Sequence, residues 1–262
     1  MTLAVIGVGS MGEALLAGWL ASGWEPDEVV VVQHSQARAQ AITQRYGVRR
    51  VELQEAGGAD VVVLGVKPHQ MLGVLGDLAP HLRPSTLVIS VAAGITLARM
   101  AEALPQGQPL ARVMPNTPSL LRKGMAGVVM GPNTSTADRE KVVGLMEAVG
   151  KAVVVPEESI HAVVGVAGSA PAFLFYVAEA LIEAGVQQGL TRAQATVLVN
   201  QTFAGAAAML EDSGASATSL REQVTSPGGT TAAGLRELDE RGVRAAFMAT
   251  VQVAADRSRD MA

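Results

Sequence analysis

A glycine-rich turn near the start of the chain has the clearest chemical meaning. Residues 7–12 read Gly-Val-Gly-Ser-Met-Gly, after an apolar run at 3–6 and before a helical pattern at 13–20. In such a turn the first glycine bends the chain tightly, the second leaves room for a pyrophosphate, and the third lets helix and strand pack closely. The N–H groups at the helix start attract the anion. The residues expected to contact a dinucleotide here are Ile6, Gly7, Gly9, Ser10, Met11 and Gly12.

The residues after the second apolar run bear on which dinucleotide binds. A site for NAD usually has Asp or Glu there, to bind the ribose hydroxyls. This chain has Gln33-His34-Ser35. No carboxylate would repel a 2′-phosphate, and His34 and Ser35 could donate hydrogen bonds to it, with Arg38 as a further candidate. We therefore expect NADPH as the cofactor, with NADH possible; the alternative is a solvated loop of ordinary turn-forming residues.

A second segment, 225–231, carries hydroxyl groups and glycines into a helical pattern. It reads Thr-Ser-Pro-Gly-Gly-Thr-Thr. N–H groups at a helix start, approached closely at Gly228 and Gly229, suit a carboxylate. The alternative is a plain helix start, with Ser226 as N-cap and Pro227 at the first helical position, and both descriptions can hold together.

Three further positions could contact a cofactor or substrate. Lys67 follows an apolar run, at the sheet edge where open α/β folds bind ligands, and it could meet the nicotinamide or a substrate carboxylate. A lone lysine there could equally be an exposed side chain. Val91-Ala92-Ala93 ends another run in small residues and leaves space for a flat ring. Asn116 can orient a carboxamide because it both donates and accepts, although asparagine between prolines is also common in turns.

These residues require a sheet to position them. Short apolar runs alternate with helical patterns up to about residue 156, which predicts a mainly parallel sheet covered on both faces. The expected strands are 3–6, 29–32, 61–66, 87–91, 110–113, 126–130 and 152–155. We thus expect an α/β Rossmann domain over 1–157.

The remainder, 158–262, is expected to form an all-α domain. Thr191 followed by Gln194, and Ser219 followed by Glu222, are possible capping boxes. The helices are rich in Ala, Val and Met with few charges, more apolar surface than one small domain buries. We therefore expect this domain to meet a second subunit.

Composition limits the other possibilities. The 262 residues carry a net charge of −4 without a basic run, which argues against nucleic-acid binding. No cysteine is present, in agreement with a reducing cytoplasm, and the four histidines are not spaced as a metal-binding pair, so no metal is expected. Glycines interrupt the first apolar run, so we expect no signal peptide. The apolar stretch 160–177 contains Pro171 and has acidic flanks, which favours a core or interface helix over a membrane span.

Several blocks occur together in an informative order. They are VKPH at 66–69, AAGIT at 92–96, RVMPNTP at 112–118, GSAPA at 168–172 and TSPGGTT at 225–231. With the glycine turn they closely resemble the Δ1-pyrroline-5-carboxylate reductase family, from Val5 to about Asp256. The resemblance implies NADPH-dependent reduction of pyrroline-5-carboxylate to L-proline, the last step of proline biosynthesis. It also implies a helical domain that interlocks with a partner's, and often a ring of such dimers.

The resemblance also implies residue roles. Thr231 would be the catalytic residue, with its hydroxyl nearest the substrate ring nitrogen. Further cofactor contacts would come from Val66, Lys67, Pro68, Val91, Ala92, Ala93 and Asn116. Substrate contacts would come from Lys67, Ala93, Gln223, Ser226, Gly228, Gly229, Thr230 and Thr231.

The chain departs from the family in places, and two rivals remain. Many members have Asn where Gln223 stands, and the asparagine that some relatives use near the adenosine ribose is missing around Glu52. One rival is a reductase of the β-hydroxyacid dehydrogenase type, which needs a lysine on a C-terminal helix, but no lysine follows Lys151. The other is a non-catalytic dinucleotide-sensing protein.

Overall fold

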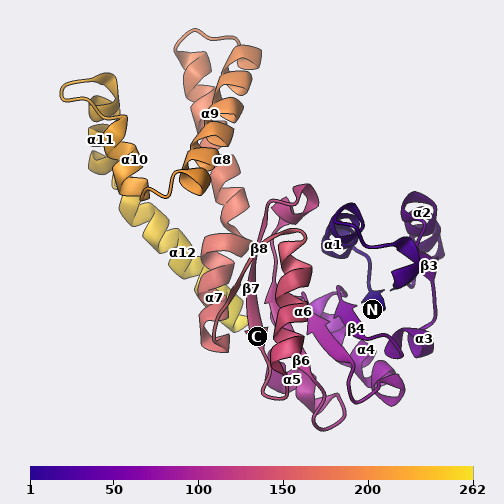
Figure 1. Cartoon of the computed structure of the whole chain (residues 1–262). Helices are drawn as coiled ribbons and strands as arrows, with labels where there is room; N and C mark the ends of the chain where they lie inside the picture. The colour runs from indigo at the N-terminus through magenta and orange to yellow at the C-terminus, as the bar shows by residue number, and fades with distance from the viewer. Residues whose placement is uncertain (262) are drawn as a thin grey trace. The chain divides into compact units, whose positions relative to one another are not determined.

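An eight-stranded sheet forms the centre of the first part of the chain, in the computed structural model, which describes residues 1–261 (Figure 1). The strand order is β3-β2-β1-β4-β5-β6-β7-β8, and the pairing is parallel except between β6 and β7. The strands are β1 Leu3–Ile6, β2 Val29–Val32, β3 Arg49–Arg50, β4 Val61–Leu64, β5 Leu87–Ser90, β6 Leu110–Met114, β7 Gly124–Met130 and β8 Gly150–Val154.

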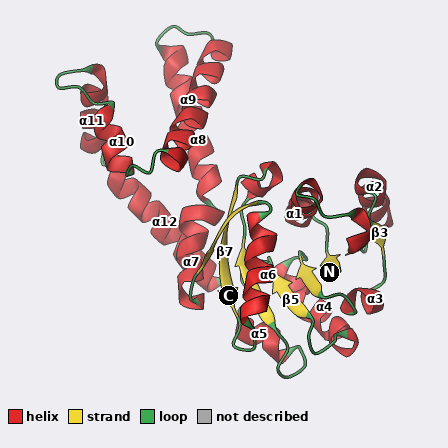
Figure 2. Cartoon of the chain, viewed as in Figure 1, coloured by secondary structure: helices red, strands yellow, loops and turns green. Residues whose placement is uncertain are grey.

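Helices cover both faces of this sheet, as Figure 2 shows. Alternate residues of β1 point to opposite faces, because successive side chains of a strand do so. The helices are α1 Ser10–Ala21, α2 Gln36–Tyr46, α3 Leu53–Gly57, α4 Met71–Leu78, α5 Leu97–Glu102, α6 Thr136–Glu147 and α7 Ile160–Val163. Leu3 and Val5 pack in one apolar cluster with α1 and α6, while Ala4 and Ile6 pack in the other with α4 and α5. The expected Rossmann-type α/β fold is confirmed.

The remaining helices form the all-α part. They are α8 Ala170–Gln187, α9 Arg192–Asp212, α10 Ala217–Gln223, α11 Thr230–Glu240 and α12 Val243–Asp260, and α8 packs against α9. Thr191 caps α9 through a capping box with Gln194, as expected. Ser219 does not cap a helix, because α10 already begins after Ser216, whose hydroxyl accepts a hydrogen bond from the Ser219 N–H.

The chain divides into two compact units. One comprises Met1–Ser169 together with the segment from Gln252, and the other comprises Ala170–Val251. The division expected after residue 157 followed the change in sequence pattern. The compact units divide later because α7 packs on β7 and stays with the sheet.

The sequence missed one strand, β3. Its two residues are exposed arginines at the end of the sheet, paired with Val30 and Val31 of β2. A strand of this length with charged side chains has neither the apolar run nor the alternation by which strands are recognised.

The indole of Trp19 ties α1 to α6, and it provides a test of this packing. Trp19 is fully buried, and its Nε1 donates a 2.7 Å hydrogen bond to the Leu145 carbonyl. Trp19→Phe should lower the free energy of unfolding by about 1–3 kcal/mol, because the buried carbonyl loses its donor. Chemical denaturation measures this, with Trp24→Phe as the control at a half-buried tryptophan. Equal losses in the two variants would contradict the role given to the hydrogen bond.

Candidate active site

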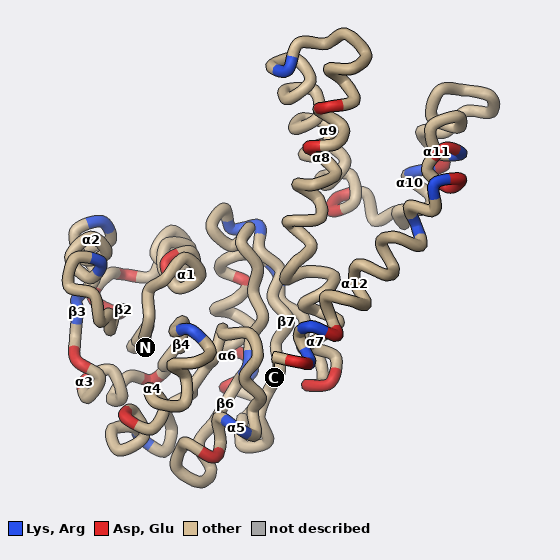
Figure 3. The backbone as a smooth tube through the Cα atoms, turned by 180° about the vertical axis from the view of Figure 1, so that it is seen from behind, with Lys and Arg blue, Asp and Glu red and all other residues tan. Residues whose placement is uncertain are grey.

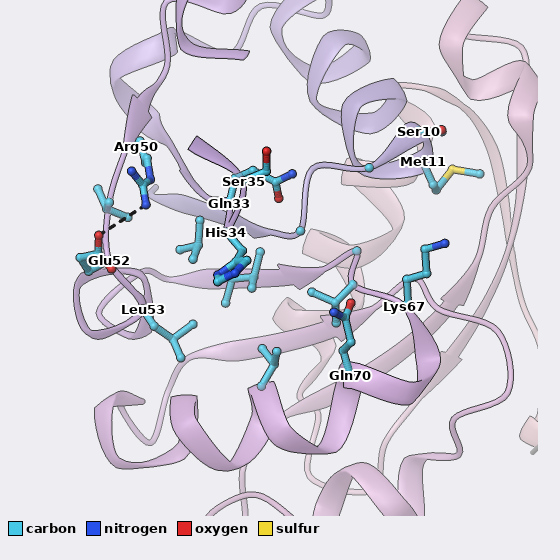
Figure 4. A pocket seen from close by; sticks show the side chains of 18 residues that line it. Ser10, Met11, Gln33, His34, Ser35, Arg50, Glu52, Leu53, Lys67 and Gln70 are labelled. Atoms are coloured by element: carbon cyan, nitrogen blue, oxygen red, sulfur yellow. Dashed lines mark ion pairs between the residues drawn. The ribbon is translucent and has the colours of Figure 1, made fainter. Parts of the chain in front are cut away.

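A cavity of about 740 Å³ lies in the first unit, at the carboxyl ends of β1, β2 and β4 (Figure 4). Parallel sheets of this kind bind their ligands at that edge, where the strand order reverses about β1. The cavity is lined by these residues that the sequence indicated: Ile6, Gly7, Gly9, Ser10, Met11, His34, Ser35, Val66 and Lys67.

The three glycines of the turn have different surroundings. Gly7 has φ +85°, and a Cβ placed on it would lie 2.6 Å from Val66 Cγ1. A Cβ on Gly12 would lie 2.6 Å from the Gly7 carbonyl oxygen, so this glycine allows the helix to start against the turn. A Cβ on Gly9 would meet nothing within 4 Å. Gly9 therefore presents bare backbone to the open cavity, and this space fits a cofactor pyrophosphate.

The segment after β2 brings His34 and Ser35 to the cavity but withdraws Arg38 from it. The Ser35 hydroxyl caps α2 by accepting from the Arg38 N–H. The Arg38 guanidinium binds the Glu13 carboxylate, and its Nε donates to the Val8 carbonyl at 3.2 Å. Arg38 is thus engaged by the protein and does not line the cavity.

Glu13 is the centre of a small charged cluster on α1 and α2. Its carboxylate also accepts hydrogen bonds from Arg45 at 3.1 Å and from the Tyr46 hydroxyl at 3.0 Å. Burial raises the pKa of Glu13, but the hydrogen bonds from Arg38 and Tyr46 together with the two arginine charges outweigh it, so the pKa lies below its ordinary value. Glu13 is therefore a carboxylate at neutral pH, and it holds both arginines.

Asn116 is placed differently from what a direct cofactor contact would suggest. Its side chain is buried, Nδ2 donates to the Ala167 carbonyl at 3.1 Å, and Oδ1 accepts from the Met125 N–H at 2.8 Å. Asn116 therefore joins the loop after β6 to β7 and to the π-helical turn Val164–Gly168. Its amide is hydrogen-bonded to the protein at both ends.

The expected cofactor residues that do not line the cavity are Gly12, Pro68, Val91, Ala92, Ala93 and Asn116. Val91 and Ala92 are buried just after β5, and Pro68 begins a short 3₁₀ helix. Gln33 and Glu52, which the sequence analysis named without giving them a contact, also line the cavity. Lining residues that the sequence did not single out are Val32, Arg50, Val51, Leu53, Gly65, Gln70 and Val74. Arg50, Val51 and Leu53 were missed because the sequence did not predict β3, and the pairing of β3 with β2 brings this segment to the cavity.

The remaining expected substrate residues lie in the second unit. The helix α11 begins at Thr230 with Gly229 as its N-cap, and Gly228 has φ +70°. Ser226 is not the N-cap; its carbonyl accepts from the Gly229 N–H at 3.1 Å in a turn before the helix. The alternative with Pro227 at the first helical position is therefore wrong. Thr231 is exposed in the first turn of α11, and Gln223 is the exposed last residue of α10.

Comparison with known proteins gives the chain its family. Residues 2–94 match the family model described as NADP oxidoreductase coenzyme F420-dependent, and residues 157–261 match pyrroline-5-carboxylate reductase dimerisation. The pyrroline-5-carboxylate reductase of Corynebacterium melassecola is 44% identical, with 99% of this chain and 98% of that protein covered. The reductase of Mycobacterium tuberculosis H37Rv is 40% identical, with 99% and 96% covered.

The chain belongs to the pyrroline-5-carboxylate reductase family. Solved members of the family share its fold. The reductase of Coxiella burnetii has a TM-score of 0.95 at 33% identity, with 100% of this chain and 98% of that chain covered. The Plasmodium falciparum enzyme, solved with NADP bound, has a TM-score of 0.88 at 27% identity, with the same coverage.

The glycine turn offers a paired test. Gly9→Ala should leave the free energy of unfolding within about 1 kcal/mol, since its Cβ meets open space. It should weaken NADPH binding by about tenfold or more, because crowding of a close contact costs about 1–3 kcal/mol. Gly7→Ala should instead lower stability by about 1–3 kcal/mol, through its positive φ and the clash with Val66.

Thermal melts and fluorescence titration with NADPH measure both quantities. A Gly9→Ala protein that binds NADPH as tightly as the parent would contradict the placement of the pyrophosphate beside Gly9.

Proposed function

We propose that this chain catalyses the NADPH-dependent reduction of 1-pyrroline-5-carboxylate to L-proline, in the cytoplasm. The observation that carries the proposal is the turn at Gly7–Gly12, open at Gly9 toward a large cavity, in a chain that matches pyrroline-5-carboxylate reductases over its whole length. When bound, NADPH supplies a hydride to C5 of the imine, and a proton adds to the ring nitrogen.

The first unit is proposed to hold the cofactor. The backbone from Gly7 to Gly12 lies against the pyrophosphate at the N-terminus of α1, where the helix dipole favours negative charge. His34 and Ser35 face the adenosine ribose. Lys67 follows β4 and lines the cavity, and it is proposed to face the nicotinamide.

Residues just after β4 and β5 are proposed to enclose the nicotinamide ring. Val66 lines the cavity, whereas Val91 and Ala92 are buried, do not line it, and would act through packing. Ala93 is half-buried and small enough to admit the ring and the substrate.

The second unit is proposed to supply the carboxylate site. The first N–H groups of an α-helix have no partner within the helix, and those of α11 begin at Thr230. Gly228 and Gly229 allow a carboxylate to approach them closely. The Gly229 N–H is already used by Ser226, so the amides of Thr230 and Thr231 are the better donors.

Reduction of the imine needs little help from an acidic side chain. The imine nitrogen is basic enough to be partly protonated in water, so orientation beside a fixed carboxylate site can supply much of the rate. The Thr231 hydroxyl, which can both donate and accept, would orient the ring nitrogen.

The decisive experiment follows NADPH absorbance at 340 nm in two assays: loss of NADPH with pyrroline-5-carboxylate, and formation of NADPH from NADP⁺ with a β-hydroxyacid. Turnover of the imine with formation of proline supports the proposal. Turnover of the hydroxyacid alone would favour a β-hydroxyacid dehydrogenase. Tight NADPH binding without turnover of either would favour a dinucleotide-sensing protein.

Thr231 gives a sharper prediction for the mechanism. Thr231→Ala should lower kcat and kcat/KM together by about ten- to a thousandfold, with NADPH affinity unchanged, if the hydroxyl acts mainly in the transition state. Thr231→Ser should keep much of the activity. A purely structural role at this exposed position would instead change stability by about 0.5 kcal/mol or less and leave kcat unaltered, which would remove Thr231 from the catalytic residues.

The second unit is also proposed to join two chains as a homodimer, with a ring of dimers possible. Its helices expose large apolar side chains, among them Phe175 at 68% and Tyr176 at 73%. Figure 3 shows few charged residues along α8 and α9. The stretch Glu157–Gln187 is long and apolar enough to cross a membrane, and 11% of its most apolar window is buried in the chain. The dimerisation match over 157–261 supports a second chain as the cover, in place of lipid.

Light scattering without detergent should therefore give at least twice the chain mass of 27.0 kDa at micromolar concentration. Phe175→Asp should shift the distribution toward smaller species, because a buried charge would be placed in an apolar interface. A stable, active monomer of the parent protein would contradict the dimer.

A further inference from the structure

The end of the cavity away from Lys67 is bordered by β3, the strand that adds to the edge of the sheet (Figure 4). Arg50 pairs in register with Val31 of β2, and the next residue, Val51, donates its N–H to the Val31 carbonyl at 3.0 Å. Strand β2 ends at Val32, and His34 and Ser35 follow after Gln33. The pairing therefore places Arg50 beside the segment where a Rossmann fold recognises the adenosine ribose.

Most arginines near this end of the cavity are already paired. Arg38 and Arg45 both bind Glu13, and Arg49 binds Glu55 at 2.6 Å. The two side chains that carry a full positive charge among the cavity-lining residues are Arg50 and Lys67. Lys67 lies across the cavity from Arg50 in Figure 4, so Arg50 is the cation placed at the adenosine end.

Arg50 has a partner of its own, but a weak one. Its guanidinium lies 3.8 Å from the Glu52 carboxylate, which is longer than a good charge-assisted hydrogen bond. The Glu52 side chain is 83% exposed, and an exposed pair of this kind contributes little. A phosphate dianion, which a guanidinium can bind through two parallel hydrogen bonds, competes well with such a carboxylate.

We propose that Arg50 determines the preference for NADPH over NADH by binding the 2′-phosphate. Glu52 is the counterion of Arg50 in the free protein, and Arg50 separates from it when the phosphate binds. His34 and Ser35 then contribute hydrogen bonds to the same phosphate, while Arg38 has a structural role. The inference rests on the proposed function only for the identity of the cofactor, since the test needs no substrate.

Arg50→Ala is the central variant, and Arg49→Ala is its matched control. The two arginines are adjacent on β3, and both changes remove one positive charge, but Arg49 does not line the cavity. Arg50→Ala should weaken NADPH binding by about ten- to a hundredfold, the usual loss for a hydrogen bond to a charged group, and change NADH binding by less than about twofold. Arg49→Ala should leave both affinities within about twofold. Arg50→Lys should fall in between, because an ammonium keeps the charge without the planar fork.

Competition by adenosine 2′,5′-bisphosphate and by AMP isolates the phosphate contact from the nicotinamide half. Arg50→Ala should raise the Kd of the bisphosphate and leave that of AMP unchanged, and added salt should shrink the difference between parent and variant. Glu52→Gln should tighten NADPH binding by about two- to fivefold, as loss of an exposed competing carboxylate allows.

Equal weakening of NADPH and NADH in Arg50→Ala, or equal losses in the Arg49 and Arg50 variants, would overturn the proposal. Unchanged NADPH affinity in Glu52→Gln would overturn the counterion role. Failure of the proposed function looks different: the parent would then bind NADPH with the Arg50-dependent preference but would not reduce pyrroline-5-carboxylate.

Discussion

The close approach of three backbone segments at the end of β1 is the constraint on which the cofactor site depends. The turn after β1, the start of α1 and the residue after β4 meet so tightly that a Cβ on Gly65 would lie 2.5 Å from the Gly7 carbonyl oxygen. A Cβ on Gly12 would meet the same oxygen. Side chains are excluded there, so the helix can start directly above the strand, and its N-terminus faces the cavity. The opening of the cavity beside Gly9 depends on this geometry.

Much of the fold could be predicted because the sheet is buried on both faces. A strand such as β4, with Val61 to Leu64 all buried, has to be a continuous apolar run, and the sequence shows it as one. The strands so identified agree with the structure to within one or two residues at each end. The helix start at Thr191 could also be predicted from the sequence, because a capping box is a local pattern.

The parts that could not be predicted depend on contacts between distant residues. Ser226 and Pro227 have the types of a helix start, but the turn closed by the Gly229 N–H moves the start to Thr230. Asn116 has the type of a ligand contact, but its amide is taken up by Ala167 and Met125. Residue type limits what a side chain can bind, whereas the fold determines which of its possible partners is near. The glycine turn could be predicted from the sequence because its proposed function depends on the backbone and not on which side-chain partners lie nearby.

The arginines around the cavity show the same distinction in terms of charge. In sequence, Arg38 is closer than Arg50 to His34 and Ser35, the residues proposed to face the ribose, and both arginines carry the same group. Glu13, on α1, determines which of the two arginines is free to bind a ligand. The Glu13 side chain is 16% exposed, and a largely buried carboxylate is stable only when it is well paired. Arg38 therefore stays paired with Glu13. Glu52 is exposed, so its carboxylate is hydrated by water and does not need to be paired with Arg50. An arginine can bind an incoming anion most readily when the carboxylate that it pairs with in the free protein is exposed to solvent. Water then hydrates that carboxylate after the arginine has moved to the anion.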